Sequence, residues 1–403
     1  MFQSDYLMFT VAIGRSSEPQ IDFTVVDTWL ATGHAAAGPG PGHAPAAAPA
    51  GPSPSPAKEK KKSKVTPSKT KPSALSPPPR AAPFSSTISR YACRILADRT
   101  SASDETSADR CRCRVYAAGF DGSRNIFLGE KATKWKKRNG EYDGLTTNGV
   151  LILKPPPVGV DDEDGAMNEN DHSVGDATPP SRAPLMYEWH EVSVDGDIYT
   201  LRETRSSSRR GDLVRDATNE LTDGTLIDLC GATLLFRTAD GLASSLTREE
   251  LDRMLHELNA TRPQCPVNLN TLVVPKRRPA RSATMECQPY AYQLCGHVQG
   301  RHAWGHKVDN RQQQHTCPIC QRTSVRLLPL SMGMESAFHI DGATLDHAFN
   351  PCGHVASAAT IRYWSRIALP HGTNSFHAVC PFCCSPLDVI QPFTKLIFQE
   401  QDY

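Results

Sequence analysis

A repeated pair of short cysteine–histidine motifs in the last third of the chain constrains the fold most strongly. Cys-Gly-His-Val is followed by Cys-Pro-Ile-Cys, and the same order recurs as Cys-Gly-His-Val and Cys-Pro-Phe-Cys. Cysteine and histidine in sets of four form closed tetrahedral zinc sites, and two ligands close in sequence can turn the backbone around one ion. The repeat predicts two structural zinc ions, held by Cys295, His297, Cys317, Cys320, Cys352, His354, Cys380 and Cys383.

The division of these ligands between the two ions stays open at this stage. In a cross-brace the first and third motifs share one ion, and the second and fourth share the other. In sequential pairing each ion takes two consecutive motifs. Each of His302, His306, His315, His371 and His377 can replace a named ligand or be an ordinary surface or packed histidine. The cysteines outside the repeat are expected to be spare thiols, and they include Cys265, Cys287 and Cys384.

Other functions of cysteine and histidine motifs are excluded, because the companion residues that they require are missing from the sequence. The chain has no HExxH metalloprotease motif, no HxE that pairs with a PCxxC as in zinc deaminases, and no βαβ context for a redox CxxC. Sites closed by four cysteine and histidine ligands leave no open position for water. We therefore expect the zinc to hold the fold together and not to hydrolyse a substrate.

Length and charge bound the remaining possibilities. A chain of 403 residues has room for two or three domains. Its formal net charge of +1 indicates neither nucleic acid nor a membrane surface as partner. No run approaches the ~18–20 apolar residues of a transmembrane helix, and the start lacks the basic region of a secretory signal. We expect a cytoplasmic protein with no membrane insertion, no nucleic-acid partner and no disulfides.

Two biased segments divide the chain. Residues 33–84 are rich in Ala, Pro and Gly and then in Lys, and residues 155–184 are acidic and bounded by prolines. Such compositions bury too little apolar surface to offset the entropy of ordering, so both are expected to be disordered. The sequence predicts a β-rich region that begins in 1–32 and continues over 85–262, followed by a zinc-binding domain over 263–403.

Short β-prone runs separated by Asp-Gly and Asn-Gly turns indicate a β-sandwich in the first half. The runs are 21–27, 91–97, 114–118, 149–153, 197–204 and 228–238. One helix is expected after them, because Thr247 and Glu250 form a capping box and Leu251, Met254 and Leu255 line one face.

Three short motifs in the first half resemble a forkhead-associated (FHA) domain, a β-sandwich whose loops bind phosphothreonine. They are GRS at 14–16, TISR at 87–90 and DGLTTNG at 143–149. The resemblance implies that Arg15 and Ser89 contact the phosphate, while Thr147 and Asn148 hold the peptide backbone. Guanidinium and hydroxyl donors suit a dianionic phosphate. The alternative is that these are turn residues of an ordinary sandwich.

Read together, long stretches of the chain resemble the Pellino family of E3 ubiquitin ligases. They include IGRSSEPQIDFTVVDT, STISRYACRI, AAGFDGSRNIFLGEKATKW, DGLTTNGVLIL and LCGHVQGRHAWGH. The resemblance implies a mainly β protein, with an FHA sandwich carrying a wing insertion and a small double-zinc, RING-like domain. Because only thirteen residues precede Gly14, and because 33–84 interrupts the motifs, we expect this sandwich to be incomplete at its edge.

The family resemblance also implies partners and a mechanism. A RING-like module recruits a ubiquitin-charged E2 enzyme and orients it toward a substrate lysine, without a nucleophile of its own. Phosphorylated interleukin-1 receptor-associated kinases of Toll-like and interleukin-1 receptor signalling would bind the FHA domain. Ile319, Pro381 and Trp364 are the residues expected to face the E2 enzyme, with local core as the alternative for each. The rival function is a non-enzymatic phosphothreonine-binding adaptor whose zinc module is purely structural.

Overall fold

The structure is a computed structural model that carries side chains. It describes residues 7–26, 86–100, 110–120, 126–128, 132–154, 187–261, 263–277, 287–309, 312–372 and 375–399. The whole of the basic segment 33–84 and the whole of the acidic segment 155–184 lie outside these residues, so their predicted disorder stays a prediction. In the part of the chain that is described, no helix is both long and apolar enough to cross a membrane.

The first sheet contains the two strands, β1 and β3, that adjoin two of the three predicted phosphate-binding motifs. Its order is β2-β1-β3-β4, with β1 antiparallel to β3 and parallel to the two-residue β2. The strands are β1 (Leu7–Gly14), β2 (Phe23–Thr24), β3 (Cys93–Thr100) and β4 (Arg110–Ala117). Among the described residues β2 alone pairs with the outer side of β1, and the expected incompleteness of this edge stays a prediction.

The second sheet packs on the first and closes the sandwich. Its order is β11-β10-β9-β12-β13. The strands are β9 (Leu151–Leu153), β10 (His190–Val192), β11 (Ile198–Tyr199), β12 (Leu226–Asp228) and β13 (Thr233–Leu235). Ile13, Cys93 and Val115 of the first sheet lie in one buried cluster with Ile152 and Ile227 of the second. The apolar β-prone runs thus form the core, as the sequence predicts for a sandwich.

Two small hairpins extend from the sandwich at and after residues 117–135, the segment that the family resemblance places in or near the wing. They are β5 (Gly119–Phe120) with β6 (Ile126–Phe127), and β7 (Thr133–Lys136) with β8 (Tyr142–Leu145). Gly140, Gly196 and Gly224 of the predicted turns all have positive φ, between 82° and 90°. These conformations suit glycine, so the Asn-Gly and Asp-Gly signals are confirmed there.

Two helices, α2 (Ala239–Ala243) and α3 (Arg248–Ala260), follow the sandwich. The predicted capping box of α3 is present, since Thr247 accepts from the Glu250 N–H and Glu250 accepts from the Thr247 N–H. Leu251 and Leu255 are buried together with Leu272 and Leu328 from later in the chain. The helix therefore shares a core with the C-terminal residues, whereas the sequence-based boundary grouped it with the sandwich.

The described residues of the C-terminal module form small sheets, the α-helix α4 (Ala358–Arg366) and the 3₁₀-helix η1 (Ser336–Phe338). Its first sheets have the orders β15-β14-β19 and β16-β17-β18, and its later ones are β20-β22-β21-β25 and the hairpin β23-β24. The bounds are β14 (Tyr290–Tyr292), β15 (Val298–Gln299), β16 (His306–Asp309), β17 (Gln312–Thr316), β18 (Thr323–Ser324), β19 (Leu327–Pro329), β20 (Ser331–Met332), η1 (Ser336–Phe338), β21 (His347–Phe349), β22 (His354–Ala356), β23 (Ala368–His371), β24 (Ser375–Ala378) and β25 (Phe393–Lys395).

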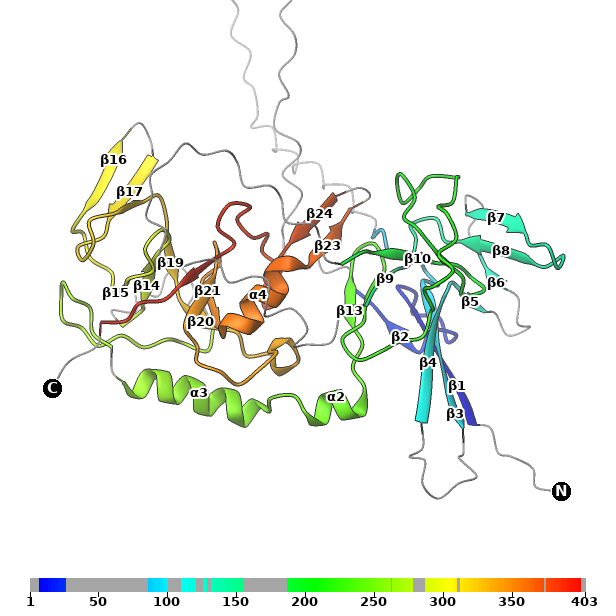
Figure 1. Ribbon diagram of the computed structural model, residues 1–403, viewed down its shortest axis with the longest axis horizontal. Coiled ribbons are helices and arrows are strands. Elements are labelled where there is room, and N and C mark those ends of the chain that lie inside the picture. Colours follow the sequence, from blue (N-terminus) through cyan, green and yellow to red (C-terminus); the bar gives the residue numbers. More distant parts are fainter. Residues whose placement is uncertain are drawn as a thin grey trace, which may run out of the picture.

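The sandwich and the C-terminal module share a hydrophobic core. Leu151 and Trp189 of the sandwich are buried in one cluster with Phe349, Ile361 and Trp364 of the C-terminal module. The β23–β24 hairpin lies beside β9, β10 and β13 in the middle of the molecule, between the two regions (Figure 1). The Trp189 indole N–H donates to the carbonyl of Ala368 at 2.9 Å. The two regions are therefore packed directly against each other.

Candidate metal centres and phosphate-binding loops

The first metal-ligating cluster lies at the end of the C-terminal module farther from the sandwich. Cys295, His297, Cys317 and Cys320 each place a ligand atom within 4.8 Å of the other three. The first two residues sit in the turn from β14 to β15. Gly296 between them has φ +75°, and a Cβ there would lie 1.8 Å from the carbonyl oxygen of Lys395. Only glycine fits this turn, which explains the Cys-Gly-His spacing.

The second cluster repeats the same construction closer to the sandwich. The ligand atoms of Cys352, His354, Cys380 and Cys383 also lie within 4.8 Å of one another. Gly353 has φ +77°, and a Cβ would lie 2.2 Å from the carbonyl oxygen of Pro329. The sequence motifs therefore encode two equivalent backbone turns.

The two Cys-Pro-x-Cys segments also form matching knuckles. The residue after the second cysteine has positive φ in both, +59° at Gln321 and +55° at Cys384. Its N–H donates to the carbonyl of the first cysteine at 2.8 Å in both, to Cys317 and to Cys380. Cys384 thus holds the backbone position of Gln321 and is not a cluster member, in agreement with its prediction as a spare thiol.

The donor sets fit a thiophilic divalent cation. Each cluster offers three sulfurs and one imidazole, the chemistry of a closed zinc site. The buried Nδ1 of His297 has no hydrogen-bond partner among the described residues. Burial raises the pKa of the Cys295 thiol to about 12, so a nearby cation is needed to favour the thiolate. A bound metal would remove both costs, because it takes the imidazole nitrogen and the deprotonated sulfur as ligands.

Each cluster is built from two consecutive motifs, so the pairing left open by the sequence is sequential. The described residues show no cross-brace, since no cluster mixes the first motif with the third. The additional histidines lie outside both clusters. His306 and His315 face each other across β16 and β17, with 3.2 Å between their Nδ1 atoms. Cys265 is buried in the core that includes Leu251.

The three residues expected to face an E2 enzyme differ in exposure. Ile319, inside the first knuckle, is 44% exposed, and Pro381 in the second knuckle is half-buried. Trp364 is only 4% exposed, and its indole N–H donates to the carbonyl of Phe338 at 2.8 Å. Trp364 is therefore a core residue, the alternative that the sequence left open for it, and does not face an E2 enzyme. Its apolar ring faces the shared core because α4 packs that side against β21 and β24.

The three motifs predicted to bind phosphate meet at one end of the sandwich. The N–H of Arg15 donates to the carbonyl of Ser89 at 3.2 Å, and its guanidinium Nε donates to the carbonyl of Ile88 at 2.6 Å. The side-chain amide of Asn148 donates to the carbonyl of Thr87. Thr147 is half-buried next to Asn148. Segments more than 50 residues apart are thus assembled into a single loop cluster.

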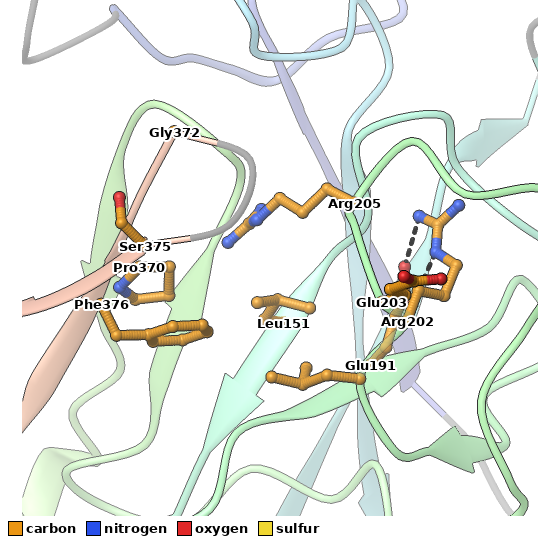
Figure 2. A pocket seen from close by; sticks show the side chains of 10 residues that line it. Leu151, Glu191, Arg202, Glu203, Arg205, Pro370, Gly372, Ser375 and Phe376 are labelled. Carbon is orange, nitrogen blue, oxygen red and sulfur yellow. Dashed lines mark hydrogen bonds and ion pairs between the residues drawn. The ribbon is translucent and has the colours of Figure 1, made fainter. Parts of the chain in front are cut away.

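A buried ionic layer supports this loop cluster, and sequence reasoning missed it. The Arg205 guanidinium is paired with Asp228 and donates from Nη1 to the carbonyl of Asn148 at 3.2 Å. Arg202 makes a bidentate pair with Glu191, with both side chains at most 2% exposed (Figure 2). Fully paired buried charges of this kind fix side-chain positions. The available signal was the Arg202-Glu203-Thr204-Arg205 charge pattern at the end of the β-prone run 197–204.

Models of known protein families match both the sandwich and the C-terminal module. The model of the Pellino FHA domain matches residues 2–254, and the model of the Pellino RING domain matches residues 258–402. The chain belongs to the Pellino family. Its mainly β architecture, an FHA domain followed by a RING domain, is the fold class expected from the sequence.

Individual Pellino proteins align over most of the chain. E3 ubiquitin-protein ligase pellino homolog 2 of Mus musculus is 49% identical over 314 residues, covering 78% of this chain and 68% of that protein. Protein pellino of Drosophila melanogaster is 47% identical over 315 residues, covering 78% of this chain and 66% of that protein. E3 ubiquitin-protein ligase pellino homolog 3 of Homo sapiens is 42% identical over 396 residues, covering 98% of this chain and 68% of that protein.

Proposed function

We propose that this Pellino-family chain is an E3 ubiquitin ligase that recruits a ubiquitin-charged E2 enzyme through its C-terminal module. The observation that carries the proposal is the pair of complete ligand clusters within a matched RING domain. Relatives of the chain bear the name E3 ubiquitin-protein ligase. The C-terminal module would bind the E2–ubiquitin thioester and orient it toward a substrate lysine, so that the rate increase comes from proximity and orientation.

The cofactor in this proposal is zinc, with one structural ion in each cluster. Zinc is favoured because thiolate and imidazole ligands in fours suit it better than Mg²⁺ or Ca²⁺, which take oxygen ligands. The ions would hold the knuckles in place. Ile319 and Pro381 would then contact the E2 enzyme, because the knuckle residues leave part of their apolar surface accessible.

The substrate-recognition half of the proposal is phosphothreonine binding by the loop cluster. Arg15 and Ser89 would contact the phosphate, and Thr147 and Asn148 would hold the peptide backbone. The convergence of these loops supports the assignment. The proposed partners that bind this loop cluster are phosphorylated interleukin-1 receptor-associated kinases, which the family resemblance implies. A cytoplasmic location remains a prediction from the sequence.

Ubiquitin-chain formation with a panel of E2 enzymes tests the ligase assignment. Wild type is compared with Cys317→Ala plus Cys320→Ala, which should lose one zinc ion and all chain formation. Cys287→Ala, a thiol outside both clusters, is the matched control and should retain activity. If zinc-loaded wild type gives no chains with any E2, the non-enzymatic adaptor takes the place of the ligase.

Binding of phosphothreonine peptides tests the other half. Arg15→Ala should weaken binding about tenfold or more, since a hydrogen bond to a charged group contributes about 1.5–3 kcal/mol. Arg112→Ala is the control, because Arg112 is an exposed arginine of β4 and lies outside the three motifs. Equal losses in the two variants would contradict the assigned role of Arg15.

A further inference from the structure

The hairpin of β16 and β17 carries a pair of histidines that lie outside both metal-ligating clusters. It stands at the end of the C-terminal module farther from the sandwich (Figure 1). His306 of β16 lies opposite His315 of β17 in the antiparallel register. Their Nδ1 atoms are 3.2 Å apart, and their ring centroids are 4.7 Å apart. His306 is exposed and His315 is half-buried, so an ion in solution can reach the pair.

The backbone around the two histidines is held by hydrogen bonds. β17 is the central strand of its sheet, with β16 on one side and β18 on the other. The Gly305 carbonyl, which precedes the first histidine, accepts from the Thr316 N–H, which follows the second, at 2.9 Å. The fold therefore brings the two rings together before any ligand binds, and such preorganisation lowers the entropic cost of binding.

The spacing of the two nitrogens matches that of two ligands on one metal ion. An imidazole nitrogen lies about 2.0–2.1 Å from a bound Zn²⁺. Two such nitrogens that subtend an angle between a right angle and a tetrahedral angle at the ion are therefore about 2.9–3.4 Å apart. The 3.2 Å between the Nδ1 atoms of His306 and His315 falls within this range.

The same distance also suits a hydrogen bond, in which one Nδ1 carries a proton and the other accepts it. A divalent cation would take the place of that proton, and each ring would keep its remaining proton on Nε2. The adjacent lysine does not oppose this exchange. Lys307 follows His306 along β16, so strand alternation places it on the other face of the hairpin, opposite Gln314.

Two imidazole ligands determine the class of ion that fits. Imidazole suits Zn²⁺, Cu²⁺ and Ni²⁺, whereas Mg²⁺ and Ca²⁺ take oxygen ligands. Among the described residues no third histidine, cysteine or carboxylate joins the pair, so water would fill the remaining positions of the ion. An ion with two protein ligands is held more weakly than one with four, and it would exchange with the solution while the two clusters keep their ions.

We propose that His306 and His315 form a third, exchangeable site for a divalent transition-metal ion, separate from the two zinc clusters. The ion would bridge β16 and β17 and stiffen the hairpin. β17 ends at Thr316, directly before Cys317, so the ion would act on the strand that leads into the first cluster without supplying a ligand to it. The inference does not depend on the proposed ligase activity or on phosphothreonine binding.

Nickel binding by the full, zinc-loaded chain without a histidine tag tests the site. Ni²⁺ is the probe because it suits imidazole and, unlike Cu²⁺, does not oxidise thiols. Isothermal titration calorimetry should give one Ni²⁺ per chain, and His306→Ala and His315→Ala should each weaken its affinity about tenfold or more. Even outer-shell partners of metal ligands change affinity about 10–100-fold, and a direct ligand should matter at least as much.

His377→Ala is the matched control. His377 is exposed and lies on the β23–β24 hairpin, where its ring centroid is 5.9 Å from that of His371. This variant should bind Ni²⁺ as wild type does. Every variant should keep two zinc ions and the melting temperature of wild type, before and after the titration, because neither histidine of the site is buried or belongs to a zinc cluster.

Hydrogen exchange measures whether the ion bridges the two strands. Saturating Ni²⁺ should slow the exchange of the β16 and β17 amides in wild type and leave it unchanged in His306→Ala, because a bridging ion opposes local opening of the hairpin. Absence of Ni²⁺ binding by wild type, or wild-type affinity in either single variant, would overturn the site. Unchanged exchange of these amides in wild type saturated with Ni²⁺ would overturn the bridge.

Discussion

The two metal-ligating clusters have the same motif and the same backbone turns but different surroundings. The knuckle residue Ile319 of the first cluster is 44% exposed. Its counterpart in the second cluster, Phe382, packs against the rings of Phe338, His339, Phe349 and His354. A repeated ligand pattern therefore determines the local backbone geometry. Whether the residue between the ligands is exposed or packed depends on the elements that surround it.

The contrast extends to the ligands themselves. Cys352 and Cys380 of the second cluster belong to the buried core that includes Leu151 and Trp189 of the sandwich. Neither the buried Cys317 nor the exposed Cys320 of the first cluster belongs to that core. Loss of the second ion is thus expected to disturb both regions of the molecule, whereas loss of the first is expected to stay local. Four substitutions test this difference, in order of decreasing effect on stability.

The largest effect is expected for Cys380→Ala combined with Cys383→Ala. Structural zinc contributes about 10–16 kcal/mol to the folding of small domains, which is comparable to the stability of a whole protein. The C-terminal module should unfold and Trp189 should become exposed, which tryptophan fluorescence and thermal unfolding would detect. Cys384→Ala is the control, because that thiol lies outside the cluster. Unchanged melting of the double variant would contradict the central place of this site in the shared core.

Phe382→Ala should cost about 3 kcal/mol of unfolding free energy, in the range for loss of a packed aromatic ring. Its ring lies in the space beside Gly333, where an added Cβ would come within 2.3 Å of it. Urea unfolding at saturating zinc measures the change. A cost below about 0.5 kcal/mol, typical of surface substitutions, would show that the second knuckle is not packed as described.

Trp189→Phe should cost about 1–2 kcal/mol, because it removes one indole donor and leaves the Ala368 carbonyl without that partner. Trp304→Phe is a suitable control, since Trp304 is 48% exposed. The same denaturation experiment compares the two. Similar midpoints for both variants would indicate that the contact between sandwich and hairpin contributes little.

Ile319→Ala should change stability by less than about 0.5 kcal/mol, as expected for an exposed side chain. Ubiquitin transfer should nevertheless fall about tenfold or more if Ile319 anchors the E2 enzyme, because truncated interface anchors commonly cost 2 kcal/mol or more. Discharge of ubiquitin from a charged E2 enzyme measures the effect. Normal discharge by this variant would remove Ile319 from the proposed E2-binding surface.

Features encoded by neighbouring residues were predictable from the sequence. The grouping of the eight candidate ligands in two clusters, the capping box of α3 and the glycine turns depend on spacing of a few residues, and the structure shows each of them. Features made by distant segments were not. The burial of Trp364 arises where the sandwich packs on the C-terminal module, and the support of Asn148 by Arg205 arises where two segments 57 residues apart meet within the sandwich. A single sequence does not show which apolar faces will meet.

The most direct test of the account counts zinc ions in a chain that lacks the whole first cluster. The variant replaces Cys295, His297, Cys317 and Cys320 with alanine, and native mass spectrometry reports the zinc bound per molecule. Two independent clusters predict two ions in wild type and one in the variant, with the sandwich and the second cluster still folded. A variant that binds no zinc while the sandwich remains folded would contradict the account, because a cross-braced arrangement loses both ions together.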